Sequence, residues 1–483
     1  MGITATKAIH NRVPIDPHNV AQCVEAVRLA AVAAIITSPF WLHALLFTFS
    51  DQTSSFICVP LLAIVGAAVA LYFTQTDYYL RRLMMTGLVA HMAASSTFLW
   101  VAYFIYYGAV DAFHYWTIGL QLADRFQLSG WSVFQPPYWS SNLIYNICGV
   151  AAVLIGDALP TLFIAFALVP LAGAYLYYRA FTAAFPDGDR WLFGLLVVLS
   201  PSLLFWSSFV GKDSLIQIFI ALTFWGFAKV TQRHSFRGVL YSAAGLAGIV
   251  LIRAHVAAIL AIAMTFPYVV GRSRAGKPRK GTKLPAELVA RRIILAPVLM
   301  GCTYFLIFQA RTFLRSNTSG GNDTMSAFQE ADLVTKNSQA GGSAFNKGTS
   351  LALRIVESPF LMFRPFPWEI RSWLALAAAA ESFGWILVYV ARRREIWSTL
   401  KDWRDPYVGF LLMYAIVFSI TFGASISNFG LLTRERIMMM PAVFMLTCAQ
   451  RKLPTRGSPK RLKEGGRMTF LNRRAQPGLN FRR

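Results

Sequence analysis

An acidic residue opens a stretch in which polar side chains share one helix face. Asp111, His114 and Tyr115 stand at positions i, i+3 and i+4, so on a helix they lie on the same side. A carboxylate placed in this way can take a proton from a hydroxyl nucleophile, as a general base does. We therefore expect Asp111 to be catalytic, and His114 and Tyr115 to contact the substrate.

Further ionisable residues lie at the ends of apolar segments elsewhere in the chain, and most of them are cations. The candidates for a substrate or phosphate site are Lys212, Asp213, Arg253, His255, Arg364, Glu369, Arg434 and Arg436. Charges near the hydrocarbon boundary of a membrane cost several kcal/mol unless they are paired or solvated in a cavity. A cavity that gathers these residues would suit an anionic ligand, such as phosphate or pyrophosphate.

Together these residues suggest the displacement of a lipid phosphate from a sugar by an acceptor hydroxyl. Asp111 would take the proton, and the cations would stabilise the departing phosphate. The structural alternatives are that Asp111 caps its helix and that Lys212 and Arg253 reach toward the membrane surface. The five cysteines show no CxxC spacing, so we expect them to be packing residues, with neither a disulfide framework nor a metal site. No cofactor is expected, and a divalent metal is not indicated.

The elements that must position these residues are membrane helices. The chain has 483 residues, of which 56% are hydrophobic and 14% charged, whereas about 25% of a soluble protein is charged. Its apolar residues run in blocks near the length of a membrane span, and such blocks must be helical because lipid offers no partner to an unpaired amide. The predicted fold is an all-α, polytopic bundle of about twelve transmembrane helices. The apolar blocks fall near residues 26–49, 56–74, 84–107, 158–179, 192–208, 213–230, 239–253, 255–271, 293–312, 370–391, 407–424 and 436–449.

The net charge of +24 is concentrated in alternate connections between these blocks. Basic cytoplasmic loops are typical of membrane proteins, so both termini are expected in the cytoplasm and the candidate site on the extracytoplasmic face. The basic runs lack interleaved aromatic residues, and a nucleic-acid partner is therefore not expected.

The chain divides into six expected parts. They are an N-terminal three-helix transmembrane segment (1–107), an extracytoplasmic loop with membrane-parallel helices (108–157), central transmembrane helices (158–312), a second extracytoplasmic loop (313–369), C-terminal transmembrane helices (370–450) and a basic cytoplasmic tail (451–483).

The segment VDAFHYWTIGLQLA (110–123) resembles the first extracytoplasmic loop of GT-C glycosyltransferases, which use polyprenyl-phosphate-linked sugars. In that family an acidic residue follows a transmembrane helix and opens a membrane-parallel helix. The segments SPSLLFWSSFVGKDSLI, LIRAHVA, FRPFPWEI and NFGLLTRERIMMMP are similar to a group of bacterial membrane proteins of surface polysaccharide assembly, over about residues 108–449. Asp111 is followed by Ala112, where many GT-C enzymes carry a second acidic residue.

The resemblance implies an inverting glycosyltransferase in a bacterial inner membrane. Its donor would be a polyprenyl-phosphate or -diphosphate sugar, and its acceptor a polysaccharide or glycolipid. An O-antigen or exopolysaccharide polymerase or ligase, which transfers a whole oligosaccharide, is the alternative within the enzymes. A lipid or polysaccharide flippase is the alternative of another class, although transporters tend to place polar residues at the midplane between repeats.

Overall fold

The computed structural model of the chain describes residues 53–129, 134, 136, 139–233, 235–270, 301, 304, 345, 351–361, 363–370 and 372–449. All of them belong to the first of the two units into which the chain divides, Met1–Arg451. The apolar block predicted at 26–49 and the tail 451–483 lie outside the described residues, as do nearly all of the block at 293–312 and of the loop at 313–350.

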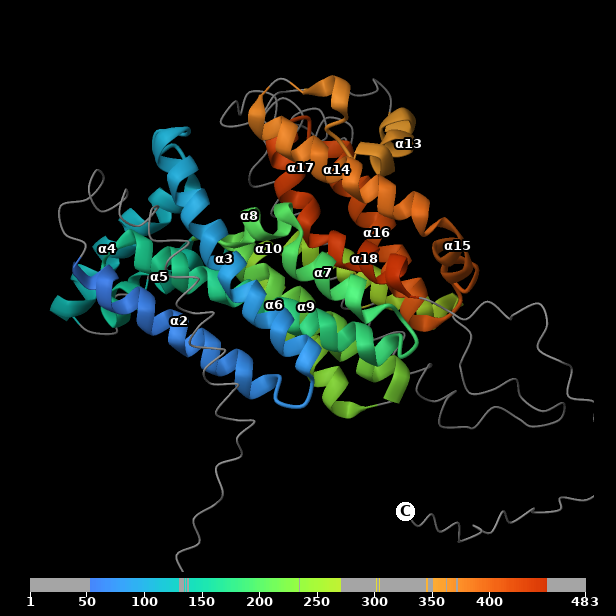
Figure 1. The fold of residues 1–483 in the computed structure, drawn as a ribbon, viewed down its shortest axis with the longest axis horizontal. Helices are drawn as coiled ribbons and strands as arrows, with labels where there is room; N and C mark the ends of the chain where they lie inside the picture. The colour runs from blue at the N-terminus through green and yellow to red at the C-terminus, as the bar shows by residue number, and fades with distance from the viewer. Residues whose placement is uncertain are drawn as a thin grey trace, which may run out of the picture. The chain divides into compact units, whose positions relative to one another are not determined.

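The described residues form helices and contain no strand, in agreement with the all-α prediction (Figure 1). The α-helices are α2 (Thr53–Phe73), α3 (Tyr78–Phe104), α4 (Asp111–Ser129), α5 (Ser141–Ile155), α6 (Leu159–Ala184), α7 (Arg190–Leu199), α8 (Pro201–Ser207), α9 (Lys212–Arg233), α10 (Phe236–Val270), α13 (Leu351–Leu361), α14 (Trp373–Ala391), α15 (Arg393–Lys401), α16 (Pro406–Ser425), α17 (Phe429–Glu435) and α18 (Met440–Cys448). Two 3₁₀ turns accompany them, η2 (Pro367–Glu369) and η3 (Arg436–Met438).

Six of the described helices are long and apolar enough to cross a membrane: α3, α6, α9, α10, α14 and α16. Helices α7 and α8 form a pair bent by 41°, which makes a seventh span if the pair crosses together. These helices indicate a multi-pass membrane protein. With α10 counted as a single span, the described part of the chain reaches about half of the predicted number of spans.

Side-chain caps fix where several of these helices begin. Asp77 accepts a hydrogen bond from the amide of Leu80 at the start of α3, and Asp189 does the same for Leu192 in α7. At the start of α17 the Asn428 side chain accepts from the amide of Gly430. The first amides of a helix have no partner within it, so such caps stabilise the helix start by about 1 kcal/mol.

Helix α10 is interrupted at Arg253, where the backbone leaves the helical region (φ −147°, ψ 86°). The interruption divides α10 into the halves 236–252 and 254–270, each roughly 25 Å long at helical rise. The first half packs closely on α9, since a Cβ added at Gly245 would lie 2.3 Å from the Thr223 hydroxyl. Only glycine permits this approach.

The second half of α10 runs beside α16 in the opposite direction. Just after the interruption, the His255 ring lies 5.6 Å from that of Phe422, near the end of α16. Farther along, the Phe266 ring lies 6.2 Å from that of Trp403, which precedes the start of α16. The second half of α10 is therefore antiparallel to α16.

Helices α9 and α16 are also antiparallel, because the Phe227 ring near the end of α9 lies 4.7 Å from the Phe410 ring near the start of α16. The first half of α10 follows α9 after a short turn and returns along it. The two halves of α10 consequently run in opposite directions, and Arg253 lies at the tip of a helical hairpin. The sequence predicts this tight turn, between the apolar blocks 239–253 and 255–271.

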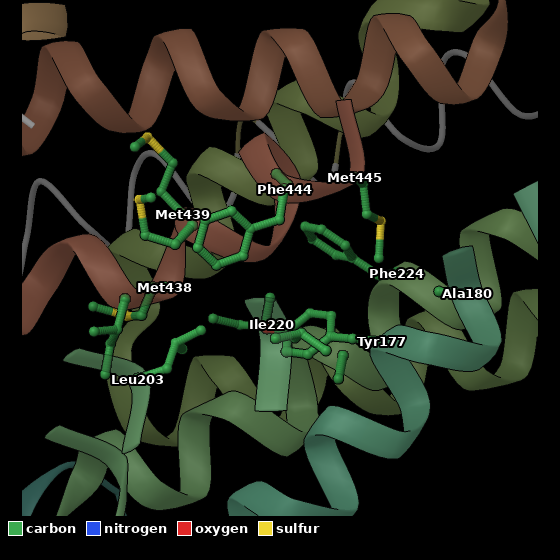
Figure 2. Close-up of a cluster of buried hydrophobic side chains, with 14 of the residues drawn as sticks. Tyr177, Ala180, Leu203, Ile220, Phe224, Met438, Met439, Phe444 and Met445 are labelled. Carbon is green, nitrogen blue, oxygen red and sulfur yellow. The ribbon is translucent and has the colours of Figure 1, made fainter. Parts of the chain in front are cut away.

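The core of the bundle lies between α6, α9 and the C-terminal segment of η3 and α18. Figure 2 shows part of it, with Tyr177 and Ala180 from α6, Leu203 from α8, Ile220 and Phe224 from α9, and Met438, Met439, Phe444 and Met445 from the C-terminal segment. These side chains are buried, and the unbranched thioether side chain of methionine adapts readily to irregular gaps in a core. This packing fixes the segment that follows α17.

The basic helix termini meet at one end of the bundle, which we call the basic end. There Arg392 forms an ion pair with Asp189, the Asp189 amide donates to the Cys448 carbonyl at 2.9 Å, and the Tyr79 hydroxyl donates to the Trp191 carbonyl at 2.8 Å. The tip of the α10 hairpin and the start of α9 lie at the other end.

Candidate functional site

A cavity of about 440 Å³ lies at the end of the bundle opposite the basic end, where α4, α9, α10, α16 and α17 meet. Its volume falls within the range of ligand sites in proteins. Six of the residues predicted for the site line this cavity: Asp111, Tyr115, Lys212, Arg253, His255 and Arg434. The structure therefore brings together residues from four helices that are separated by up to 323 positions in the chain.

Asp213 joins the two arginines of the cavity. Its side chain is completely buried, and one carboxylate oxygen accepts from Arg253 Nη2 at 2.8 Å. The other oxygen accepts from Arg434 Nε. A buried carboxylate is tolerated when it is paired in this way, and the pairing fixes both guanidinium groups against the cavity wall.

Glu435 completes the ion-pair chain and was not predicted from the sequence. It lies next to Arg434, lines the cavity and forms an ion pair with Arg253. The sequence does contain a signal for Glu435, because it stands between Arg434 and Arg436 at the predicted end of a membrane helix, where a charged residue needs a partner. The charges of the cavity are therefore more balanced than the sequence suggested, with three carboxylates (Asp111, Asp213, Glu435) against three cations (Lys212, Arg253, Arg434).

Asp111 differs from the other two carboxylates in its exposure. Its side chain is 56% exposed, compared with 0% for Asp213 and 12% for Glu435. It begins α4 and accepts from Arg434 Nη1 at 3.1 Å. Asp111 is consequently the most accessible of these three carboxylates to a substrate.

Tyr115 lies one helical turn after Asp111 and is buried in the wall of the cavity. Burial raises the pKa of its hydroxyl to about 12, and the nearby charge of Asp111 also raises that pKa. The phenol therefore keeps its proton at neutral pH. Tyr115 can donate a hydrogen bond to a ligand but does not serve as a base.

Lys212 points its ammonium group at Ser140, whose hydroxyl accepts at 3.0 Å. Among the described residues it forms no ion pair, unlike the two arginines. Ser140 has an unusual backbone conformation (φ 57°, ψ −128°), and its amide donates to the Leu251 carbonyl at 2.6 Å. A non-glycine residue held at positive φ is strained, and such positions concentrate at functional sites.

Most of the remaining wall of the cavity is apolar or aromatic. Val250, Leu251 and Ile252 come from the α10 hairpin, and Trp139 lies at the cavity with 57% of its surface exposed. The His255 ring packs against Phe422. The cavity thus combines charged groups with a broad aromatic side chain, which suits a polar ligand that has flat apolar faces.

Five of the predicted residues do not line this cavity: His114, Asp213, Arg364, Glu369 and Arg436. Asp213 is connected to it through its ion pairs with Arg253 and Arg434. His114 is exposed on α4, and its ring lies 5.5 Å from that of Tyr145. Arg364 and Glu369 form an ion pair with each other, and the Arg364 guanidinium also lies 4.3 Å from the Phe345 ring. Their assignment to substrate binding stays a prediction.

Arg436 belongs to a second buried polar cluster. It is completely buried and forms an ion pair with Glu381 of α14 at 3.3 Å. Glu381 also accepts from the amide of Ser202 at 2.8 Å, so it caps the start of α8 at the α7–α8 bend. Sequence reasoning missed Glu381, although a single acidic residue within an apolar span of about twenty residues is a signal.

No three His, Cys, Asp or Glu residues of the described part come together in a way that could hold a metal ion. The three described cysteines, Cys58, Cys148 and Cys448, are not in disulfide bonds. No protein family, no curated protein and no solved structure matches this chain. The function is therefore inferred from the site itself.

Proposed function

We propose that the chain is a membrane glycosyltransferase that transfers a sugar from a polyprenyl-phosphate or -diphosphate carrier to a polysaccharide or glycolipid acceptor. The observation that carries this proposal is the exposed carboxylate of Asp111 at a cavity that also holds Lys212, Arg253 and Arg434. A base and a group of cations are the two parts that displacement of a phosphate by a hydroxyl requires.

The proposed reaction is a single displacement at the anomeric carbon of the donor sugar. The acceptor hydroxyl gives its proton to Asp111, and its oxygen forms the new bond to the anomeric carbon of the donor sugar. The bond between that carbon and the phosphate oxygen breaks, and its electron pair stays on the lipid phosphate. Lys212 and the Arg434 guanidinium stabilise the charge of this leaving group. Attack opposite the leaving group inverts the configuration of the anomeric carbon.

The membrane accounts for the position of the site. A lipid carrier keeps its phosphate at the membrane surface, and the cavity lies at an end of membrane-spanning helices. With the basic end in the cytoplasm, the cavity faces the extracytoplasmic side of a bacterial inner membrane. Both termini would then be cytoplasmic.

A polymerase or ligase that transfers a whole oligosaccharide is the second candidate. It is favoured by the two arginines that Asp213 fixes at the cavity, since these can hold a diphosphate carrier without using Asp111. Retention of turnover after neutralisation of Asp111 would distinguish it from the first candidate.

Mass spectrometry of the lipids that copurify with the chain tests the substrate class. We expect polyprenyl-phosphate or polyprenyl-diphosphate sugars to be bound, and to be lost from a Lys212→Ala variant. Enrichment of phospholipids alone would contradict the proposal.

The orientation is tested by cysteine labelling from the outside, in a background without the native cysteines. Asp124→Cys, on exposed α4, should react, and Arg394→Cys, at the basic end, should not. The reverse pattern would place the cavity in the cytoplasm and rule out an extracytoplasmic donor.

A further inference from the structure

Arg434 is shared between two carboxylates that differ in their surroundings. Its Nε donates to Asp213, and its Nη1 donates to Asp111 at 3.1 Å. The guanidinium group is planar and carries several donors in a fixed arrangement, so one arginine can hold two partners at once. Arg434 is further fixed by its position over the Phe209 ring, 5.5 Å from the ring centre.

The two contacts of Arg434 have unequal strength. Asp213 is completely buried and is also held by Arg253, so this partner cannot move away. Asp111 is 56% exposed, and ion pairs that water can reach contribute little, at most a factor of about five in an equilibrium. An anion that enters the cavity therefore competes easily with Asp111 but not with Asp213.

We propose that Arg434 exchanges partners when an anionic ligand binds: it keeps Asp213 and passes its outer contact from Asp111 to the phosphate of the ligand. Until an anion binds, Arg434 thus holds the carboxylate that the proposed reaction uses. The exchange frees Oδ2 of Asp111, the oxygen that Arg434 holds, for the acceptor hydroxyl only when a donor is present. This inference rests on the proposed function for the role of Asp111, but the exchange itself concerns binding alone.

The remaining charges around Asp111 fit this exchange. Lys212 lies in the same cavity and is not engaged by a carboxylate of the described residues, so it offers a second contact to the anion. Tyr115 stays protonated and can donate to the same anion. Asp213 serves as a positioning residue, because it holds Arg434 in place during the change of partner.

A double-mutant cycle measured by binding of inorganic pyrophosphate to the purified full chain tests the exchange. Asp111→Asn removes the competing carboxylate and should tighten pyrophosphate binding by about three- to fivefold. In an Arg434→Lys background all the donors lie on one nitrogen, so an ammonium held by the buried Asp213 does not reach Asp111 as the separate Nε and Nη1 of the guanidinium do. Asp111→Asn should then change the affinity by less than about twofold.

Asp124→Asn is the matched control, since Asp124 is an exposed carboxylate on the same helix and does not line the cavity. It should leave the affinity unchanged, and melting temperatures establish that all variants fold. Equal tightening by Asp111→Asn in both backgrounds would show general repulsion of the anion and overturn the exchange. Failure of the parental chain and of Asp111→Asn to bind millimolar pyrophosphate would overturn it as well. If the binding measurements contradict the exchange but Asp111→Asn still slows turnover, the exchange is wrong and the proposed function stands.

Discussion

Neutralising Asp213 is expected to destabilise the fold far more than neutralising Asp111. Asp213→Asn removes the buried partner of two arginines, of which Arg253 keeps Glu435 while Arg434 keeps only the exposed Asp111. Breaking a buried ion pair by removing one partner costs about 3–5 kcal/mol, because a buried charge is left uncompensated. Removing the charge of an exposed pair costs about 0–1 kcal/mol.

Thermal unfolding in detergent, at one fixed scan rate, measures this difference. With a shift of about 2 °C for each kcal/mol, Asp213→Asn should lower the apparent melting temperature by roughly 6–10 °C. Asp111→Asn should lower it by no more than about 2 °C. Comparison at one scan rate is needed because unfolding of such proteins is often irreversible. Equal melting temperatures for the two variants would refute the reasoning that Asp213 is the anchor of the cavity.

Two further variants test other parts of the account. Trp139→Ala removes an exposed aromatic surface at the cavity, so it should raise the KM for the acceptor about two- to tenfold. The control Trp139→Phe should have a KM closer to that of the parental chain. An unchanged KM for Trp139→Ala in kinetic assays would exclude stacking of the acceptor on this ring. Gly245→Ala places a Cβ 2.3 Å from the Thr223 hydroxyl and 2.6 Å from the Phe219 carbonyl. It should therefore lower the free energy of unfolding by about 1–3 kcal/mol, measured as a lower melting temperature. In the control Gly384→Ala the added Cβ meets nothing within 4 Å, so the melting temperature should not fall.

The helices and their breaks could be predicted because they depend on local pattern. The apolar blocks near 84–107, 158–179, 213–230 and 407–424 correspond to α3, α6, α9 and α16, with boundaries that differ by several residues. The turn at Arg253 was predicted because Arg253 and His255 are polar residues between two short apolar blocks, 239–253 and 255–271, and the structure breaks α10 at this position. Asp111 was also correctly expected to open a helix.

The partners of the charged side chains could not be predicted in the same way, because they depend on which helices become neighbours. Counting cations along the chain suggested a strongly cationic cavity, but Asp213 and Glu435 neutralise Arg253 and Arg434. Arg436 was grouped with Arg434 although it points to Glu381 in another cluster. Residues two positions apart on a helix point in different directions, so the sequence already allowed Arg434 and Arg436 to have different partners. Which partner each arginine takes required tertiary information.

Transfer of sugar in proteoliposomes that contain polyprenyl-linked sugars and acceptor tests the central claim most directly. The measured quantity is the release of free polyprenyl phosphate or diphosphate, followed by mass spectrometry, for the parental chain, Asp111→Asn and the control Asp124→Asn. If Asp111 is the base, Asp111→Asn should fold and bind donor but release carrier about 10²–10⁴ times more slowly, with Asp124→Asn near the parental rate. Release at the parental rate by a folded Asp111→Asn protein would contradict the account and favour a polymerase that depends on its arginines.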